Sequence, residues 1–270
     1  MNPIDYEPAL RLGVFLAAFA ALALWERLAP ARALRLPRVQ RWQANLGLAL
    51  VSTLVVRFIV PASAVAVAVL AAKEGWGLLH RVEMPAWSAI LVTVVLLDLT
   101  VYLQHVLYHS VPLLVRLHSV HHADPDFDLT TGIRFHPLEI LLSALIRMAA
   151  VAALGASVIA VLVFELLLNA SAMFNHANAS LSAWLERRVR GVLVTPDMHR
   201  IHHSVIEAER NSNYGSCLSI WDRLLGTYTA APAGDLDIGL AAWRDPSSIA
   251  TLPGTLGMPF HAVQANLIRE

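Results

Sequence analysis

The chain carries the sequence DLTVYLQHVLYHSVPLLVRLHSVHH at residues 98–122, in which an apolar run ends in closely spaced histidines. Residues three or four positions apart share one face of an α-helix, so imidazoles at this spacing project side by side. The first cluster is His105 and His109, and the second is His118, His121 and His122. This spacing is typical of metal ligands, and it follows directly on a segment apolar enough for a membrane.

A third histidine cluster occurs later in the chain. His199, His202 and His203 follow Thr195-Pro196-Asp197, which has the residue types of a helix start. One structural zinc takes about four ligands, so eight clustered histidines favour two metal ions. His176, at the end of a later apolar stretch, is a ninth candidate ligand; the alternative is an interfacial histidine that bonds a backbone carbonyl.

The ligand types restrict the metal and the chemistry. Imidazoles without thiolates suit iron, copper, zinc or nickel rather than calcium or magnesium. Cys217 is the one cysteine, which excludes an iron-sulfur cluster, and the sequence has no GxGxxG dinucleotide motif. Electrons must therefore come from another protein. A histidine-rich site for two metals beside a membrane indicates redox chemistry on lipids.

The composition indicates a membrane protein. Hydrophobic residues make up 57% of the chain and charged residues 15%, whereas soluble domains are roughly 45–50% apolar. The formal net charge is zero, and no clustered basic face indicates a nucleic-acid partner.

Four apolar stretches predict an all-α, multi-pass membrane bundle of about three spans plus a helical hairpin, with a histidine-rich cap. They lie at about Pro8–Leu28, Ala44–Ala72, Ala86–Val106 and Leu138–Asn175, the last broken near Gly155. We expect an N-terminal transmembrane anchor at 1–97, a catalytic domain at 98–228 and a loop-rich cap segment at 229–270. Trp184 to Leu193 is predicted to be a short basic amphipathic helix on the lipid headgroups.

The distribution of basic residues predicts the orientation. The loop after the first span is rich in arginine, with Arg32, Arg35, Arg38 and Arg41, so the positive-inside rule places it in the cytoplasm. The third span and the hairpin then both return to that side. All three histidine clusters are therefore expected to meet on the cytoplasmic face.

Other polar residues are candidates for supporting roles. Asp98 either orients a ligand imidazole through its second ring nitrogen or forms an ion pair with Arg57 between helices. His136 either contacts the metal shell or the substrate, or caps a helix. Asp222 and Arg223 are candidates for bracing the third histidine cluster from outside.

The pattern resembles the fatty acid hydroxylase and sterol desaturase superfamily of membrane di-iron oxidases. The matching motifs are Asp98-xxx-Tyr102-xx-His105-xxx-His109, His118-xx-His121-His122, Arg134-x-His136-Pro-x-Glu139, His176-x-Asn178, His199-xx-His202-His203 and Asn213-Tyr214-Gly215 leading to Trp221-Asp222-Arg223. The resemblance implies that the nine histidines His105, His109, His118, His121, His122, His176, His199, His202 and His203 are metal ligands. It also implies roles around the metals or the substrate for Asp98, Tyr102, Arg134, His136, Glu139, Asn178, Asn213, Asp222 and Arg223.

The resemblance further implies two iron ions, dioxygen as co-substrate and an external reductase as electron donor; zinc in purified protein is also compatible with the ligands. The expected reaction is hydroxylation or desaturation of a C–H bond in a lipid such as a fatty acyl chain or a sterol. One alternative is a zinc-dependent membrane hydrolase, which ranks lower because no HExxH motif is present. Another is a non-enzymatic histidine-rich metal-binding or transport protein, whose histidines would line a path across the bilayer.

Overall fold

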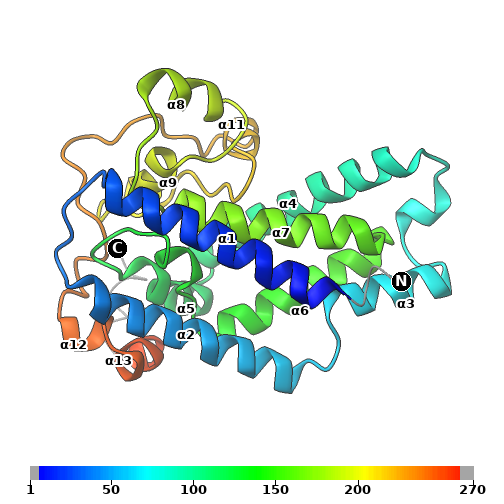
Figure 1. Cartoon of the computed structure of the whole chain (residues 1–270), viewed down its shortest axis with the longest axis horizontal. Coiled ribbons are helices and arrows are strands. Elements are labelled where there is room, and N and C mark those ends of the chain that lie inside the picture. Colours follow the sequence, from blue (N-terminus) through cyan, green and yellow to red (C-terminus); the bar gives the residue numbers. More distant parts are fainter. Residues whose placement is uncertain (1–5, 262–270) are drawn as a thin grey trace.

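A bundle of long helices dominates the computed structural model, which describes residues 6–261 (Figure 1). The long helices are α1 (Glu7–Leu28), α2 (Arg38–Ile59), α4 (Ala86–Ser110), α6 (Pro137–Leu154) and α7 (Val158–Asn175). Within the described residues, β-structure is limited to three isolated bridges. Five segments are long and apolar enough to cross a membrane. The predicted all-α membrane bundle is confirmed, and the chain is a multi-pass integral membrane protein.

The second predicted span is divided into two helices. One of the five apolar segments, Arg38–Arg81, contains both α2 and the shorter α3 (Ala64–Glu74). Pro61 lacks a backbone N–H and follows the end of α2. The Ser63 side chain then caps α3 by accepting from the backbone N–H of Ala66. The division lets α3 fold back against α6 and α7.

The predicted hairpin consists of α6 and α7, each 18 residues or about 27 Å long. Gly155 ends α6 with a φ of +67°, in the left-handed region that favours glycine. A Cβ at this position would lie 2.4 Å from the carbonyl oxygen of Trp76, so the close approach also requires glycine. The hairpin returns the chain to the end of the bundle from which α6 started.

Short helices and loops form a cap at one end of the bundle (Figure 1). They are α5 (Pro112–His122), α8 (Ala183–Val189), α9 (Pro196–His202), α10 (Glu207–Arg210), α11 (Ile220–Leu224), α12 (Pro246–Ile249) and α13 (Leu252–Gly257). Loops were expected after residue 229, but α12 and α13 form there and pack Ile249 and Ala250 against Leu48 of α2 and Val120 of α5. Residues 262–270 of the expected cap segment lie outside the described part of the chain.

A buried ion network attaches the cap to α2. The Arg41 guanidinium donates to the carboxylates of Asp124 at 2.7 Å and Asp128 at 2.6 Å, and all three side chains are at most 1% exposed. Burial raises the pKa of Asp124, but the charge and hydrogen bonds of Arg41 outweigh it and lower that pKa to about 2. Arg41 therefore belongs to a helix and an internal network, not to the basic loop in which it was placed.

Candidate metal centre

The structure brings all nine predicted ligand histidines together as two adjacent groups. Five of them offer ligand atoms within 4.8 Å of one another, and the remaining four do the same. The five-histidine group is His105, His109, His118, His122 and His202; the four-histidine group is His121, His176, His199 and His203. Each group therefore combines histidines from separate parts of the sequence.

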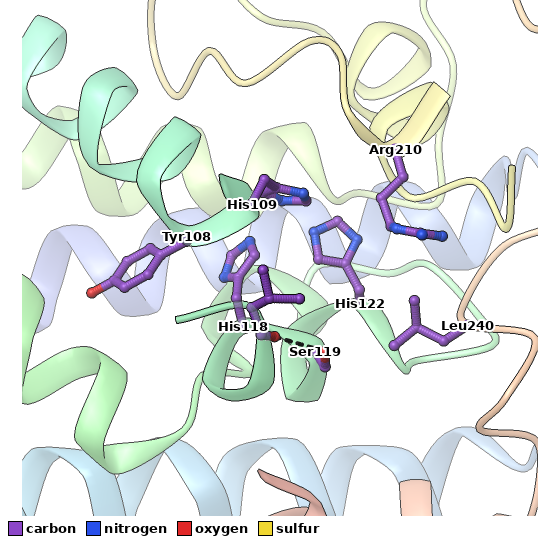
Figure 2. Close-up of a pocket in the computed structure, with 8 residues that line it drawn as sticks. Tyr108, His109, His118, Ser119, His122, Arg210 and Leu240 are labelled. Atoms are coloured by element: carbon purple, nitrogen blue, oxygen red, sulfur yellow. Dashed lines mark hydrogen bonds between the residues drawn. The ribbon is translucent and has the colours of Figure 1, made fainter. Parts of the chain in front are cut away.

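The helices contribute to the two groups in a regular way. The end of α4 supplies His105 and His109, and the end of α7 leads to His176. The α5 and α9 helices contribute to both groups, because neighbouring residues of a helix point about 100° apart. His121 and His122 thus belong to different groups, and the same is true of His202 and His203. Figure 2 shows His109, His118 and His122 converging from α4 and α5.

The spacing of the ring nitrogens fits metal coordination. In the five-histidine group, the Nε2 atoms of His105 and His118 are 3.1 Å apart. In the four-histidine group, Nε2 of His176 lies 3.1 Å from those of His121 and His203 and 3.2 Å from that of His199. Ligands about 2.1 Å from one ion, at tetrahedral or octahedral angles, lie about 3.0–3.4 Å from one another.

The other ring nitrogen of several histidines bonds an acceptor outside the groups. Nδ1 donates to the backbone oxygen of Tyr214 in His105, of Ala172 in His176 and of Ser212 in His202, each at 2.7 Å. In His118, Nδ1 bonds the Glu139 carboxylate at 2.7 Å. Such bonds orient the ring and leave the lone pair of Nε2 directed inwards, as a metal ligand requires.

Burial keeps these imidazoles neutral. It lowers the pKa of His118 and of His176 to about 3. Burial, together with the neighbouring imidazoles, holds the pKa of His121, His122 and His203 well below the usual value. Neutral imidazole is the form that binds a metal. Buried Nε2 atoms of His109, His122 and His202 have no hydrogen-bond partner among the described residues, which also fits a metal ligand.

Two of the predicted supporting residues contact the histidines directly. Glu139, in the first turn of α6, bonds His118, and its second carboxylate oxygen has no partner among the described residues. The backbone oxygen of Arg134 accepts from Nδ1 of His121 at 3.3 Å. The Arg134 side chain donates to the backbone oxygen of Val120 at 2.7 Å, within the second cluster.

A second set of predicted residues acts one step further away. The Asp222 carboxylate accepts from the backbone N–H groups of Tyr214 and Gly215, at 2.7 and 2.9 Å, and so supports the carbonyl that bonds His105. Tyr102 bonds Thr227 at 2.8 Å. The Asn213 side chain bonds the backbone of Met198 and Thr229, and that of Asn178 bonds the backbone of Arg32. These residues hold the loops around the centre.

The expectations for Asp98 and Arg223 are wrong, and for His136 the structure supports one of the two expected roles. Both carboxylate oxygens of Asp98 accept from the 217–221 segment, so Asp98 orients no ligand imidazole, and Arg57 lies exposed on α2 without pairing to it. Arg223 is exposed and stacks on Tyr228 instead of bracing the third cluster. His136 caps α6 by accepting from the backbone N–H of Leu138, which is the second of its two predicted roles.

Sequence reasoning missed the residues that act through backbone oxygens and the buried acids. The carbonyls of Ala172 and Ser212 carry no side-chain signal. The alternating acids Asp124, Asp126 and Asp128 directly follow the second histidine cluster, and this pattern was the available signal for the network around Arg41.

A small cavity opens beside the five-histidine group (Figure 2). Its volume is about 30 Å³, enough for a water-sized molecule. It is lined by Tyr108, His109, Val115, His118, Ser119, His122, Arg210 and Leu240. The four-histidine group is fully buried, whereas two members of the five-histidine group are only partly buried. The two groups therefore differ in their access to solvent.

Comparison with known proteins gives a family match and several relatives. The family described as "Fatty acid hydroxylase" matches residues 90–227. An ornithine lipid hydroxylase of Rhizobium tropici is 29% identical over 159 residues, which is 58% of this chain and 47% of that protein. An alkylglycerol monooxygenase of Homo sapiens is 28% identical over 138 residues, 49% of this chain and 29% of that protein. The chain spans less than half the length of these relatives. No solved structure matches it.

Proposed function

The chain belongs to the fatty acid hydroxylase family, and we propose that it is a di-iron, dioxygen-dependent membrane enzyme that hydroxylates a C–H bond of a lipid. The observation that carries the proposal is the pair of adjacent, buried histidine groups at the end of an apolar bundle. Hydroxylation is preferred to desaturation because the relatives are named as a lipid hydroxylase and a monooxygenase.

Two irons would be held by the nine imidazoles, five around one ion and four around the other. Bound there, they would supply the activation of dioxygen and the oxidising power that an unactivated C–H bond requires. The overall reaction consumes one dioxygen, two electrons and two protons, and it yields an alcohol and one water. The electrons come from an external redox protein, because the given sequence has no GxGxxG motif for a dinucleotide and its one cysteine cannot hold an iron-sulfur cluster.

The protein's own residues prepare the site for this reaction. Burial keeps the imidazoles neutral and excludes bulk water, while Glu139 and the surrounding carbonyls fix which ring nitrogen faces the metal. The lipid reaches the centre from the apolar helices. We place the cap in the cytoplasm, because Arg32 and Arg35 on the connection between α1 and α2 lie on the cap side, where Arg35 pairs with Asp237.

The test uses purified full-length protein with iron and a chemical or enzymatic reductant. We expect about two irons per chain, dioxygen uptake, and transfer of an ¹⁸O atom from dioxygen into an ornithine lipid or an alkylglycerol supplied in mixed micelles. His202→Ala is the inactive control, and His261→Ala, at an exposed histidine, is the matched active control. Tightly bound zinc with hydrolysis of the lipid and no dioxygen uptake would overturn the proposal.

A further inference from the structure

Two segments of the cap are joined into one projecting unit, which we call the lip: residues 183–194, with α8, and residues 217–225, with α11. Leu193 and Leu218 form an isolated antiparallel bridge. Beside it, the Val194 N–H donates to the carbonyl of Cys217 and the Ser219 N–H to that of Val192, each at 3.0 Å. These contacts join the two segments, and Figure 1 shows α8 and α11 projecting together from the side of the bundle.

The lip is attached to the membrane part of the bundle by Asp98. The Asp98 carboxylate accepts from the backbone N–H groups of Cys217 and Leu218, at 3.1 and 3.2 Å, and from Nε1 of Trp221 at 2.8 Å. Asp98 is buried in the candidate membrane span α4. It precedes His105 by seven residues, which is about 10 Å along a helix towards the bilayer. The 217–221 segment of the lip therefore lies beside the middle of α4, about 10 Å further into the helical bundle than His105.

The lip also exposes large apolar side chains. Leu224 is 67% exposed, Val192 61%, Trp184 60% and Leu225 54%. A surface facing only water rarely gathers so many, and such patches mark contacts with membranes or proteins. Tryptophan in particular favours the boundary between headgroups and acyl chains.

Positive charge borders the apolar side chains. Arg187, Arg188 and Arg223 are exposed, and none of them forms an ion pair within the described part of the chain. The Arg223 guanidinium lies 3.8 Å from the ring centre of Tyr228, which holds it in a fixed position. Beside α8 is a hollow of about 490 Å³ that Arg187, Arg190 and Arg223 line. The two acidic residues at this hollow are already paired, Glu186 with Arg190 and Asp197 with Arg200.

We propose that the lip binds the surface of the membrane leaflet on the cap side, with its leucines and tryptophan in the headgroup region and its arginines on anionic lipid phosphates. Apolar and basic side chains at the boundary are the composition of an interfacial membrane anchor. The attachment to Asp98 favours a lipid surface over an acidic protein partner, since it holds the lip against the middle of a helix long and apolar enough to span the membrane. The lip would fix the depth of the metal centre relative to the lipids around it.

The test measures the depth of the lip in proteoliposomes of the full-length chain. Cys217→Ser removes the one native cysteine, so that Leu224→Cys in that background takes a single nitroxide label. Ala208→Cys is the matched control, because Ala208 is exposed on α10. The next residue after α10, Asn211, contacts His109 near the cap end of α4. Circular dichroism and gel filtration check that each labelled variant is folded.

The readout is the ratio of collision rates with dioxygen and with a water-soluble nickel chelate. We expect this ratio to be at least about fivefold higher at position 224 than at position 208, since the boundary region favours dioxygen over polar reagents. The double variant Arg187→Glu with Arg188→Glu should reduce the difference in vesicles that contain phosphatidylglycerol but not in pure phosphatidylcholine. Free inorganic phosphate should not change the difference between positions 224 and 208 in either type of vesicle.

Equal ratios at positions 224 and 208 would overturn the proposal and assign the lip to the aqueous phase, where a protein partner becomes the better occupant. The role of the arginines would be refuted if the collision ratio at position 224 changed neither with the lipid charge nor with the double variant. Neither measurement requires turnover or a lipid substrate, so these outcomes are separate from the failure or success of the proposed hydroxylase activity.

Discussion

Replacing His121 and replacing its neighbour His122 should weaken metal binding at two different sites. His121 belongs to the four-histidine group and His122 to the five-histidine group, although they are neighbours in the chain. His121→Ala leaves three imidazoles around its ion, whereas His122→Ala leaves four. Both variants should lose product formation, but they should differ in which ion is lost and how easily.

The expected magnitude follows from the number of ligands. Structural sites with four ligands bind zinc with about 10–16 kcal/mol, or about 2.5–4 kcal/mol for each ligand. Loss of His121 should therefore weaken its site by about 2 to 3 orders of magnitude. Loss of His122 should have a smaller effect, because the remaining four imidazoles still form a complete tetrahedral set.

The assay is metal content per chain after dialysis against a graded series of a chelator. Wild type and the control His261→Ala should keep two ions up to the same chelator strength. His121→Ala should fall to one ion at a chelator strength about 100-fold lower than the one wild type withstands. His122→Ala should lose one ion at a chelator strength between those of His121→Ala and wild type. The assignment of two separate groups is refuted if both variants lose both ions together, or if His122→Ala is the more sensitive of the two.

Three more predictions concern the surroundings of the centre. Glu139→Gln removes the carboxylate that bonds His118 and should weaken the five-histidine site by about 10- to 100-fold in the same chelator assay; unchanged binding would refute its role. Arg41→Ala leaves buried aspartates unpaired and should cost about 3–5 kcal/mol in unfolding experiments in detergent. As the control, Arg35→Ala breaks the exposed ion pair with Asp237 and should lower the free energy of unfolding by less than about 1 kcal/mol. Equal losses in the two variants would contradict the stabilising role of the buried network around Arg41. Acid should release metal and destabilise the fold: the unfolded histidines take up protons below about pH 6.5, whereas the pKa of folded His118 is about 3, so stability is lost as the pH falls from 6.5 towards 3. Metal release and unfolding that do not change with pH in this range would contradict it.

The structure also alters an expectation about Asp98. Since both of its oxygens hold the 217–221 segment, Asp98→Asn should reduce the yield of folded protein and leave metal content per folded chain unchanged. In the sequence, Asp98 precedes His105 by seven residues, or about two helical turns, so the two residues share one helix face and contact with a ligand was expected. Helix periodicity specifies a direction around the axis, but it does not specify which distant segment occupies that direction.

Local spacing was sufficient for the helices and for the histidine clusters. Apolar length predicts a membrane helix because the bilayer has a fixed thickness, and the three- and four-residue spacing of histidines predicts a shared face because the α-helix has a fixed period. The division of the α5 and α9 histidines between the two groups was not predictable, because it depends on where each group lies relative to the helix axis.

The sequence by itself determined that apolar helices end in imidazoles, since both properties are local and each is set by residue type and spacing. Only the tertiary structure decided the division into five and four, the burial of Arg41 among aspartates and the attachment of the lip to Asp98. Each of these depends on contacts between segments dozens of residues apart, and no local rule of spacing or composition specifies such contacts.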